Sequence, residues 1–209
     1  MKHDPAKTLI YHITDVENLP GVLADGGLHS DAVMAARKPT IIGHPHIKTR
    51  RLTQNRVVCC GNRFVGEFVP FYFCPRSPML YTINIGATGR VKGCQQTILY
   101  LVSSVAVAIG AGQTWAISKI NAGVGYADAS SFSSEVTMLD ELDWDAIRAT
   151  YWPEVVSRKA AEFLVADFFP WTSIESIGCH NETVANRVRD LLKESSHNPA
   201  VAVKPLWYY

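Results

Sequence analysis

A single glutamate near the C-terminal end of the chain has the setting of a functional carboxylate. Glu162 lies two residues after the basic pair Arg158-Lys159 and directly before a mostly apolar run that Pro170 ends. Moving an ionised group out of water is costly, so a carboxylate beside a buried segment is either held by a partner or used in chemistry. Glu162 is therefore the first candidate for a catalytic residue.

Three other places carry side chains that can bind anions or planar rings. Arg50 and Arg51 are adjacent, so in a helix or a strand only one of them faces a given pocket, and the sequence does not choose between them. His12 lies among apolar residues, where a histidine is either a hydrogen-bonded structural residue or a catalyst. The aromatic and methionine side chains of segment 68–81 suit stacking on a planar ring or packing in a core.

Several common catalytic motifs are missing. The chain has no G-x-S-x-G, G-x-x-x-x-G-K-[ST], G-x-G-x-x-G or H-E-x-x-H pattern, which weakens the case for a serine hydrolase, a P-loop NTPase, a Rossmann oxidoreductase or a zincin. Five cysteines without a C-x-x-C pair argue against a disulfide framework and a zinc ribbon. The spacing of His44 and His46 matches no standard metal site, so we expect no metal.

The net charge of +1 hides an uneven distribution. Residues 1–127 hold 13 Lys and Arg against 6 Asp and Glu, whereas residues 128–209 hold 7 against 13. Segment 32–66 has seven basic residues and no acid. Such a segment creates a positive field that suits a phosphate-bearing ligand or a nucleic acid, although a solvated basic surface would have the same composition.

The length and composition predict one soluble domain. A chain of 209 residues that is 47% hydrophobic has enough apolar residues for a sizeable core. No apolar run reaches the roughly 20 residues that span a bilayer, and the N-terminus lacks an apolar signal segment. We therefore expect a single domain over residues 1–209, without membrane association and located in the cytoplasm.

The elements that must position these groups are of mixed type. Asp15 and Asn181 are expected to cap helices, and segment 68–81 is expected to be a strand end leading into a fixed loop, since it is too rich in proline for a central strand. Segment 30–57 reads as a loop with one or two short helices. We predict strands at 8–14, 114–120, 174–180 and 201–209, and helices at 96–109, 142–151 and after 181. This order indicates an α+β fold.

Four blocks of sequence resemble the DarT family of bacterial DNA ADP-ribosyltransferase toxins, in that family's order. The Pro-Phe-Tyr-Phe and Arg-Lys-x-x-Glu-Phe motifs are the most specific of them. The blocks are Tyr11-His12-Ile13-Thr14, the run 43–52 with Gly-His-x-His-Ile-Lys-x-Arg-Arg-Leu, the run 69–81, and the run 158–165. The resemblance spans about positions 9–171 and extends to the wider ADP-ribosyltransferase superfamily.

The resemblance implies an ADP-ribosyltransferase-like split β-sheet with flanking helices and an NAD cleft. It makes Glu162 the first residue of a strand, where residue pattern alone also allows a helix, and segment 145–159 the part that meets the acceptor. It implies catalytic roles for Arg51 and Glu162. It assigns NAD contacts to His12, Thr14, Tyr72, Met79 and Arg51, and nucleic-acid contacts to Lys48, Arg50, Arg76, Trp152 and Arg158.

The chemistry of that reaction suits these residue types. Breaking the bond between nicotinamide and ribose develops positive charge on the ribose, which a carboxylate such as Glu162 stabilises more in the transition state than in the ground state. The same carboxylate can take the proton from a ring nitrogen of the acceptor base. An arginine of the 50–51 pair can hold the pyrophosphate or polarise the base. The expected acceptor is single-stranded DNA with thymine as the favoured base.

The resemblance also implies a partner and leaves alternatives. Toxins of this family pair with an antitoxin whose macrodomain removes the mark, and the implied classes are transferase, glycosyltransferase and nucleotidyltransferase. One alternative is an enzyme that modifies RNA or protein. Another is an inactive nucleic-acid-binding domain in which Glu162 pairs with Lys159 or Arg158. The glycine-containing segment 121–128 matches no further ligand residue of the family.

Overall fold

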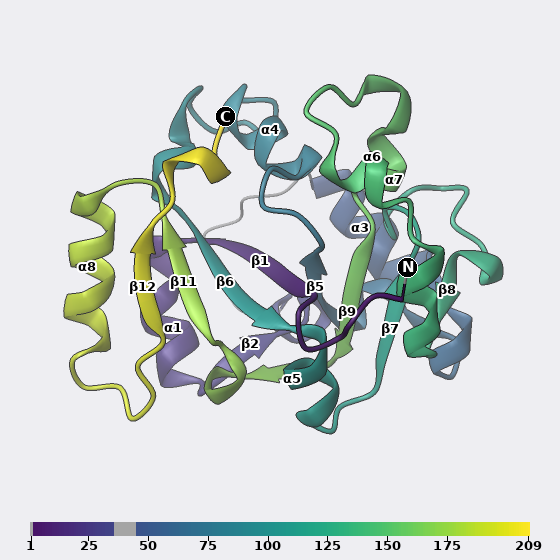
Figure 1. Cartoon of the computed structure of the whole chain (residues 1–209), viewed down its shortest axis with the longest axis horizontal. Helices are drawn as coiled ribbons and strands as arrows, with labels where there is room; N and C mark the ends of the chain where they lie inside the picture. Colours follow the sequence, from purple (N-terminus) through teal and green to yellow (C-terminus); the bar gives the residue numbers. More distant parts are fainter. Residues whose placement is uncertain (1, 36–44) are drawn as a thin grey trace.

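An eight-stranded sheet forms the centre of the fold (Figure 1). The computed structural model describes residues 2–35 and 45–209. The strand order is β12-β11-β6-β1-β5-β9-β7-β8. These strands are β1 (Leu9–Asp15), β5 (Phe68–Tyr72), β6 (Ile98–Ser104), β7 (Trp115–Ser118), β8 (Phe132–Ser133), β9 (Glu162–Ala166), β11 (Ser176–Cys179) and β12 (Ala200–Val203). Two small sheets pair β2 (Gly27–His29) with β10 (Phe168–Pro170) and β3 (Arg56–Val57) with β4 (Arg63–Phe64).

The two halves of the large sheet meet along a short seam. Strand β1 pairs with β6 over its whole length, and β5 pairs with β9 from Phe68 to Tyr72. Between β1 and β5 the register contains one pair, Tyr11 with Tyr72. The strands separate beyond it, and the side chain of His12 bridges the split through Nδ1, 2.8 Å from the carbonyl oxygen of Pro70. The sheet is thus split between β1 and β5.

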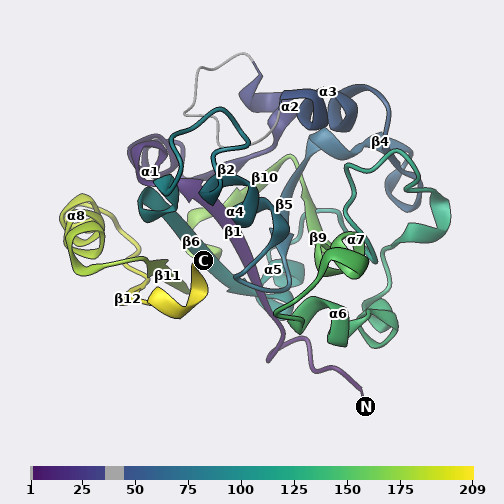
Figure 2. The ribbon, with the colours of Figure 1, turned by 90° about the horizontal axis from the view of Figure 1, so that it is seen from above.

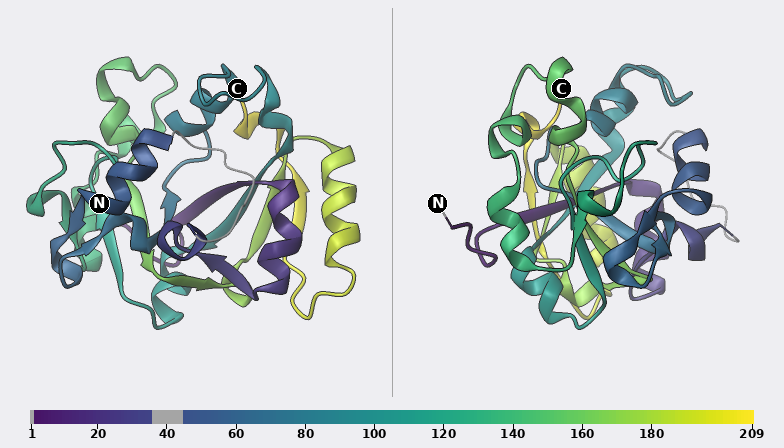
Figure 3. Two further views of the ribbon diagram at one scale, coloured as in Figure 1. Left: turned by 180° about the vertical axis from the view of Figure 1, so that it is seen from behind. Right: turned by 90° about the vertical axis from the view of Figure 1, so that its right-hand side faces the viewer.

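Short helices cover both faces of this sheet. They are α1 (Leu19–Ala24), α2 (Asp31–Met34), α3 (Pro45–Thr53), α4 (Pro78–Asn84), α5 (Val105–Gly110), α6 (Trp144–Arg148), α7 (Val156–Lys159) and α8 (Glu182–Leu192). Figure 2 shows α1, α2 and α3 on one side of the sheet and α6 on the other. The left panel of Figure 3 shows α1 (purple) and α3 (blue) on that shared side. Residues from both halves of the sheet, such as Leu101 and Phe163, are fully buried in one core cluster.

Several predicted elements are confirmed. Segment 8–14 forms β1, and Asp15 caps a short 3-10 helix by accepting a hydrogen bond from the backbone N–H of Glu17 at 3.0 Å. Asn181 caps α8 by accepting from Val184 N at 3.0 Å. The predicted strands at 114–120 and 174–180 correspond to the shorter β7 and β11. Glu162 is the first residue of β9.

The predicted helix at 96–109 is wrong. Residues Ile98–Ser104 form β6, and a helix begins only at Val105, where Ser104 caps it through Val107 N. All residues of β6 are buried because the strand lies inside the sheet with both faces covered. A strand that is buried on both faces is mostly apolar along its length, so its sequence contains no alternation that would distinguish it from a buried helix.

The interpretation of segment 68–81 as unsuited to a central strand is also wrong. Strand β5 lies in the interior of the sheet, and α4 follows it from Pro78. The carbonyl of Pro70 points toward the split, since it faces His12, and the missing N–H of the same residue points there too. No ladder hydrogen bond is lost at a position where β1 has already diverged.

Two other predicted elements are shorter than expected. The helix predicted over 142–151 is confined to α6. The strand predicted over 201–209 ends at Val203 and is followed by a 3-10 helix, Pro205–Trp207. Pro205 explains this end, because proline fixes its own backbone angle and cannot donate to a ladder. The loop predicted over 30–57 contains α2 and α3.

Candidate active site

Glu162 is held inside the sheet at the start of β9. In the strand register it lies opposite Tyr72 of β5 on one side and Ser118 of β7 on the other. Its exposed fraction is 1%, so the carboxylate lies out of bulk water. Such a buried charge needs partners that replace the lost hydration.

Arg51 supplies the main partner. Its Nη1 atom donates to both carboxylate oxygens of Glu162, at 3.1 Å to Oε1 and 2.9 Å to Oε2. The backbone N–H of Ala122 donates to Oε1 at 2.9 Å. Since Arg51 lies in the last turn of α3, a helix on one face of the sheet meets a central strand at this pair. The ion pair and the backbone donor together fix the orientation of the carboxylate.

Only one of the two terminal nitrogen atoms of Arg51 donates to Glu162. Its Nη2 atom is buried and has no hydrogen-bond partner among the described residues, although Arg51 lines a cavity. Burial opposes the charged form, but the negative charges of Glu162 and Asp31 hold the pKa of Arg51 above its usual value. Arg51 therefore stays cationic and can donate to an oxygen of a bound ligand.

This active-site cavity, about 640 Å³ in volume, lies at the split of the sheet. That volume falls within the range of small-molecule sites, roughly 300–1,000 Å³. It is lined by all five residues predicted to contact the cofactor: His12, Thr14, Arg51, Tyr72 and Met79. Residues of α1 and β2, among them Val22 and Leu28, line it as well. The cavity therefore runs from Arg51, which lies between it and Glu162, to the edge formed by α1 and β2.

The ring of His12 is fixed in one tautomer. A carbonyl oxygen only accepts hydrogen bonds, so Nδ1 must donate to Pro70 O, and Nε2 of the neutral ring is left as an acceptor. Burial lowers the pKa of His12, and the bond to Pro70 opposes that shift only in part. His12 is thus a neutral, oriented side chain in the wall of the cavity.

Tyr72 remains a neutral phenol beside the carboxylate. Burial, followed by the negative charge of Glu162, raises its pKa well above the usual value. It therefore keeps its proton at neutral pH and can donate a hydrogen bond. Tyr72 also lines the cavity and pairs with Tyr11 at the seam between the sheet halves.

The five residues predicted to bind nucleic acid are spread over four places. Lys48 lines the active-site cavity and pairs with Asp31 at 2.9 Å. Arg50 donates a long hydrogen bond, 3.4 Å, to Gly123 O. Arg76 and Trp152 line a second, smaller hollow, and Arg158 pairs with Asp143 at 3.0 Å. The structure thus separates Arg50 from Arg51, which the sequence could not do.

The loop after β7 is the functional segment that sequence reasoning missed. Ala122 N binds Glu162, and Asn121 lines the active-site cavity. Asn55, just after α3, holds this loop by donating to Ala122 O at 2.8 Å and to Val124 O at 2.6 Å. The available signal was an Asn-x-Gly turn, in which Asn121 Oδ1 accepts from Gly123 N at 2.8 Å. That pattern predicts a turn, but it does not show which part of the fold the turn contacts.

Lys159 and Arg158, the expected partners of Glu162 in an inactive binding domain, both bind other groups. Lys159 donates to the carbonyl oxygens of Ile147 and Ala149, at 2.9 and 2.8 Å, and Arg158 pairs with Asp143. Neither of them contacts Glu162, which is held by Arg51. The pairing assumed for an inactive binding domain is therefore wrong.

The described part of the chain shows neither a candidate metal cluster nor a membrane-spanning helix. Residues 2–35 and 45–209 contain no group of three or more His, Cys, Asp and Glu side chains that could hold a metal ion. His44 lies outside these residues. Within the same ranges no helix is long and apolar enough to cross a membrane.

Comparisons with known proteins agree with this geometry. A DNA ADP-ribosyl transferase of Thermus aquaticus is 41% identical over 210 residues, covering 98% of this chain and 90% of that protein. The structure of Thermus sp. 2.9 DarT in complex with ADP-ribosylated ssDNA superposes with a TM-score of 0.88 at 38% identity, and the complex with NAD+ with 0.85 at 36%. Each of these two matches covers 100% of both chains.

The fold expected from the resemblance is confirmed, because the split sheet matches these DarT structures along its whole length. A family model described as ssDNA thymidine ADP-ribosyltransferase, DarT, matches residues 11–209. The chain belongs to the DarT family of single-stranded-DNA thymidine ADP-ribosyltransferases.

Proposed function

We propose that this protein transfers ADP-ribose from NAD to a thymine base of single-stranded DNA. The observation that carries the proposal is the buried Arg51–Glu162 pair at the end of a cavity of about 640 Å³, with Arg51 Nη2 still free to donate. Family membership supports it, as does the likeness to a Thermus sp. 2.9 protein whose structures hold NAD+ and ADP-ribosylated ssDNA.

Glu162 acts as the catalytic carboxylate in this proposal. Bound NAD supplies a ribosyl group joined to nicotinamide, a good leaving group. The carboxylate of Glu162 faces the positive charge that develops when this bond breaks, and it accepts the proton that the thymine nitrogen loses. Arg51 and Ala122 N hold the carboxylate in place beforehand, so little reorganisation is needed during the reaction.

The other predicted contacts divide between the two substrates. His12, with its Nε2 acceptor, and Thr14 suit the nicotinamide-ribose half of NAD, while Tyr72 and Met79 pack near the nicotinamide or the base. Arg51 Nη2 suits an oxygen of the pyrophosphate or of the base. The cavity surface formed by α1 and β2, with Val22 and Leu28, is left for the adenosine half.

Single-stranded DNA fits because the reacting nitrogen of thymine is hydrogen-bonded inside a duplex. An unpaired base can leave the stack and enter the cavity. Lys48, Arg50, Arg76 and Arg158 are the proposed contacts to the strand, with Trp152 as a stacking surface. The reaction exchanges a glycosidic bond, so it is a pentosyl transfer, and the wider class nucleotidyltransferase has no support.

The cellular role follows from the family resemblance. In this proposal the enzyme is the toxin of a toxin–antitoxin pair, opposed by an antitoxin whose macrodomain removes the modification. Its substrates, NAD and single-stranded DNA, place it in the cytoplasm.

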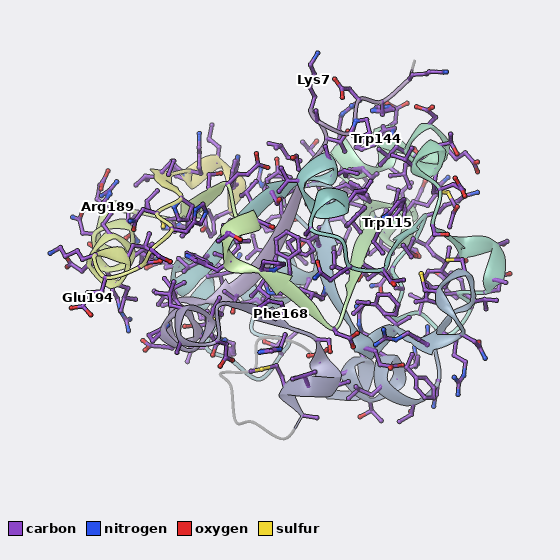
Figure 4. All side chains as sticks on the ribbon, turned by 90° about the horizontal axis from the view of Figure 1, so that it is seen from below. Lys7, Trp115, Trp144, Phe168, Arg189 and Glu194 are labelled. Carbon is purple, nitrogen blue, oxygen red and sulfur yellow. The ribbon has the colours of Figure 1, made fainter. Side chains whose placement is uncertain are left out.

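The proposal is tested by incubating the protein with labelled NAD and single-stranded DNA, RNA or protein. Wild-type protein is expected to label DNA, and fragmentation of the modified oligonucleotide is expected to locate the adduct on thymine. Glu162→Gln keeps the size of the side chain but loses its charge, so labelling should fall by about 10²–10³-fold or more. Glu194→Gln, an exposed change on another part of the surface (Figure 4), is the matched control.

The outcomes separate the alternatives. Labelling of RNA or protein in place of DNA would show that the acceptor class is wrong. DNA binding without NAD turnover would identify a binding domain. Equal labelling by Glu162→Gln and wild type would remove Glu162 from the mechanism.

A further inference from the structure

The protein has a second buried carboxylate besides Glu162. Among the acidic side chains of residues 2–35 and 45–209, two are buried, Glu162 and Asp15, each with an exposed fraction of 1%. Glu162 is the proposed catalytic carboxylate, whereas Asp15, the last residue of β1, has no part in the proposed reaction. Burying an ionised group costs free energy, so the presence of Asp15 needs an explanation of its own.

Three donors surround the carboxylate of Asp15. The backbone N–H of Glu17 donates to it at 3.0 Å, the hydroxyl of Thr97 donates at 2.8 Å, and the guanidinium of Arg90 donates through Nη2. Thr97 lies beside it because β1 pairs with β6, with Asp15 opposite Ile98 (Figure 1). Burial would raise the pKa of Asp15, but these hydrogen bonds hold it below its usual value. Asp15 is therefore ionised at neutral pH.

Asp15 shapes a turn that faces the active-site cavity. Asp15 is not itself a lining residue, but Thr14, Glu17 and Asn18 all line the cavity. By accepting from Glu17 N, Asp15 caps the 3-10 helix Val16–Asn18. Across the same turn, Asn18 Nδ2 donates to Thr14 Oγ1 at 3.2 Å. The carboxylate thus determines where three cavity-lining side chains lie.

Arg90 connects this carboxylate to another wall of the cavity. It belongs to segment 85–97, which runs from the end of α4 to β6. Met79 and Thr82 of α4 line the cavity. Arg90 also donates to Thr97 Oγ1 at 3.3 Å, so both donor side chains bind as one unit. Since a buried ion pair contributes little net stability, orientation of the cavity walls explains it better than stability does.

We propose that Asp15 is a positioning residue for NAD, which acts through Arg90 and Thr97 to hold the turn 14–18 in the shape that receives the dinucleotide. Asp15 itself touches no substrate. The proposal rests on the proposed function, because it takes NAD to be the occupant of the active-site cavity. Loss of the charge of Asp15 should therefore weaken NAD binding and leave the chemical step unchanged.

The variant Asp15→Asn tests this role. It keeps the size of the side chain and an oxygen for Glu17 N, but it removes the charge that Arg90 binds. KM for NAD, and the dissociation constant of NAD measured without DNA, should rise about five- to tenfold. At saturating NAD, kcat should stay within about twofold of wild type, since Arg51 and Glu162 lie on α3 and β9. Wild-type NAD affinity, or a lower kcat with unchanged KM, would overturn the proposal.

The matched control is Asp128→Asn. Asp128 also caps a 3-10 helix, Ala129–Ser131, by accepting from Ser130 N at 2.9 Å, and it is not a cavity-lining residue. The same substitution at the same kind of cap should leave KM for NAD at the wild-type value. An equal rise in this control would show a general effect of losing a cap, which would also overturn the proposal.

A double-mutant cycle tests whether Asp15 and Arg90 act together. Arg90→Gln changes a side chain that is 20% exposed, so it offers a second variant should Asp15→Asn fail to fold. It should raise KM for NAD by a similar factor, and the double variant should lose no more than either single variant. Additive losses would mean that the two residues act independently and that the proposal is wrong. Since NAD binding is measured without DNA and wild-type DNA labelling is measured in parallel, failure here is distinct from failure of the proposed function.

Discussion

At the scale of single residues, one guanidinium connects the buried carboxylate of Glu162 to the cavity. Arg51 uses Nη1 for both oxygens of Glu162 and leaves Nη2 free, whereas a purely structural pair would use both nitrogen atoms on the carboxylate. A buried ion pair contributes little net stability, because desolvation offsets its attraction. The arrangement is better explained by the ligand oxygen that Nη2 would meet.

Replacing each arginine of the pair by lysine tests this division. Arg51→Lys offers one compact ammonium, which cannot hold Glu162 and a ligand oxygen together, so kcat for DNA labelling should fall by about 10²-fold or more. Arg50→Lys keeps a cation near Gly123 and loses only a long hydrogen bond, so kcat should change by less than about threefold. Equal losses in the two variants would contradict the assignment of Arg51.

At the scale of elements, the sequence predicts features that depend on neighbouring residues better than features that depend on burial in the fold. Capping by Asp15 and Asn181 was correct, because a cap depends on a few neighbouring residues. The sequence did not show that Ile98–Ser104 is a strand, because both faces are covered and all of its residues are buried, so polar and apolar residues do not alternate. Pro70 led to a wrong prediction, because a proline fits in this central strand only where the sheet splits. No local sequence pattern shows that split.

The same limit applies to the candidate site. The five predicted cofactor contacts line one cavity, although their roles stay predictions. The backbone N–H of Ala122 and the side chain of Asn55 were not found, since a backbone donor has no residue type and Asn55 acts only through a contact far along the chain. Long-range contacts of this kind are set by the fold.

Asn55 provides a test of how elements position the carboxylate. It is buried and holds the loop whose Ala122 N binds Glu162. Asn55→Ala leaves two loop carbonyls without their donor, so the free energy of unfolding should fall by about 1–3 kcal/mol. The pre-set orientation of Glu162 should loosen as well, lowering kcat more than it raises KM for NAD.

The control for this variant is Asn198→Ala, which removes an exposed hydrogen bond from Asn198 to Ser195 O. It should change neither stability nor kcat appreciably. Chemical denaturation and steady-state kinetics measure the two effects. A stable Asn55→Ala protein with wild-type kcat would show that the loop needs no such support.

At the scale of the whole molecule, basic residues are concentrated around the active-site cavity and the second hollow. The basic first part of the sequence supplies Lys48, Arg51 and Arg76 to the cavity and the hollow, and the later part adds Arg148 and Lys159. Acidic residues of the later part pair elsewhere, as Asp143 does with Arg158 and Glu141 with Lys119. The net charge of +1 thus gives no hint of the local field.

The split sheet also makes stability depend on pH through His12. Its ring joins the two halves of the sheet at Pro70, and burial lowers its pKa from 6.5. Between that lowered value and 6.5 the unfolded chain binds a proton that the folded protein does not, so stability falls as pH decreases through this window. The contribution is up to about 1.4 kcal/mol per pH unit.

The variant His12→Asn tests this pH dependence. It places an amide donor near the position of Nδ1 but cannot titrate. Denaturation between pH 5 and 7, roughly the range in which a histidine titrates, should therefore show a smaller loss of unfolding free energy than in the wild type. A wild-type slope in His12→Asn would mean that another group causes the loss.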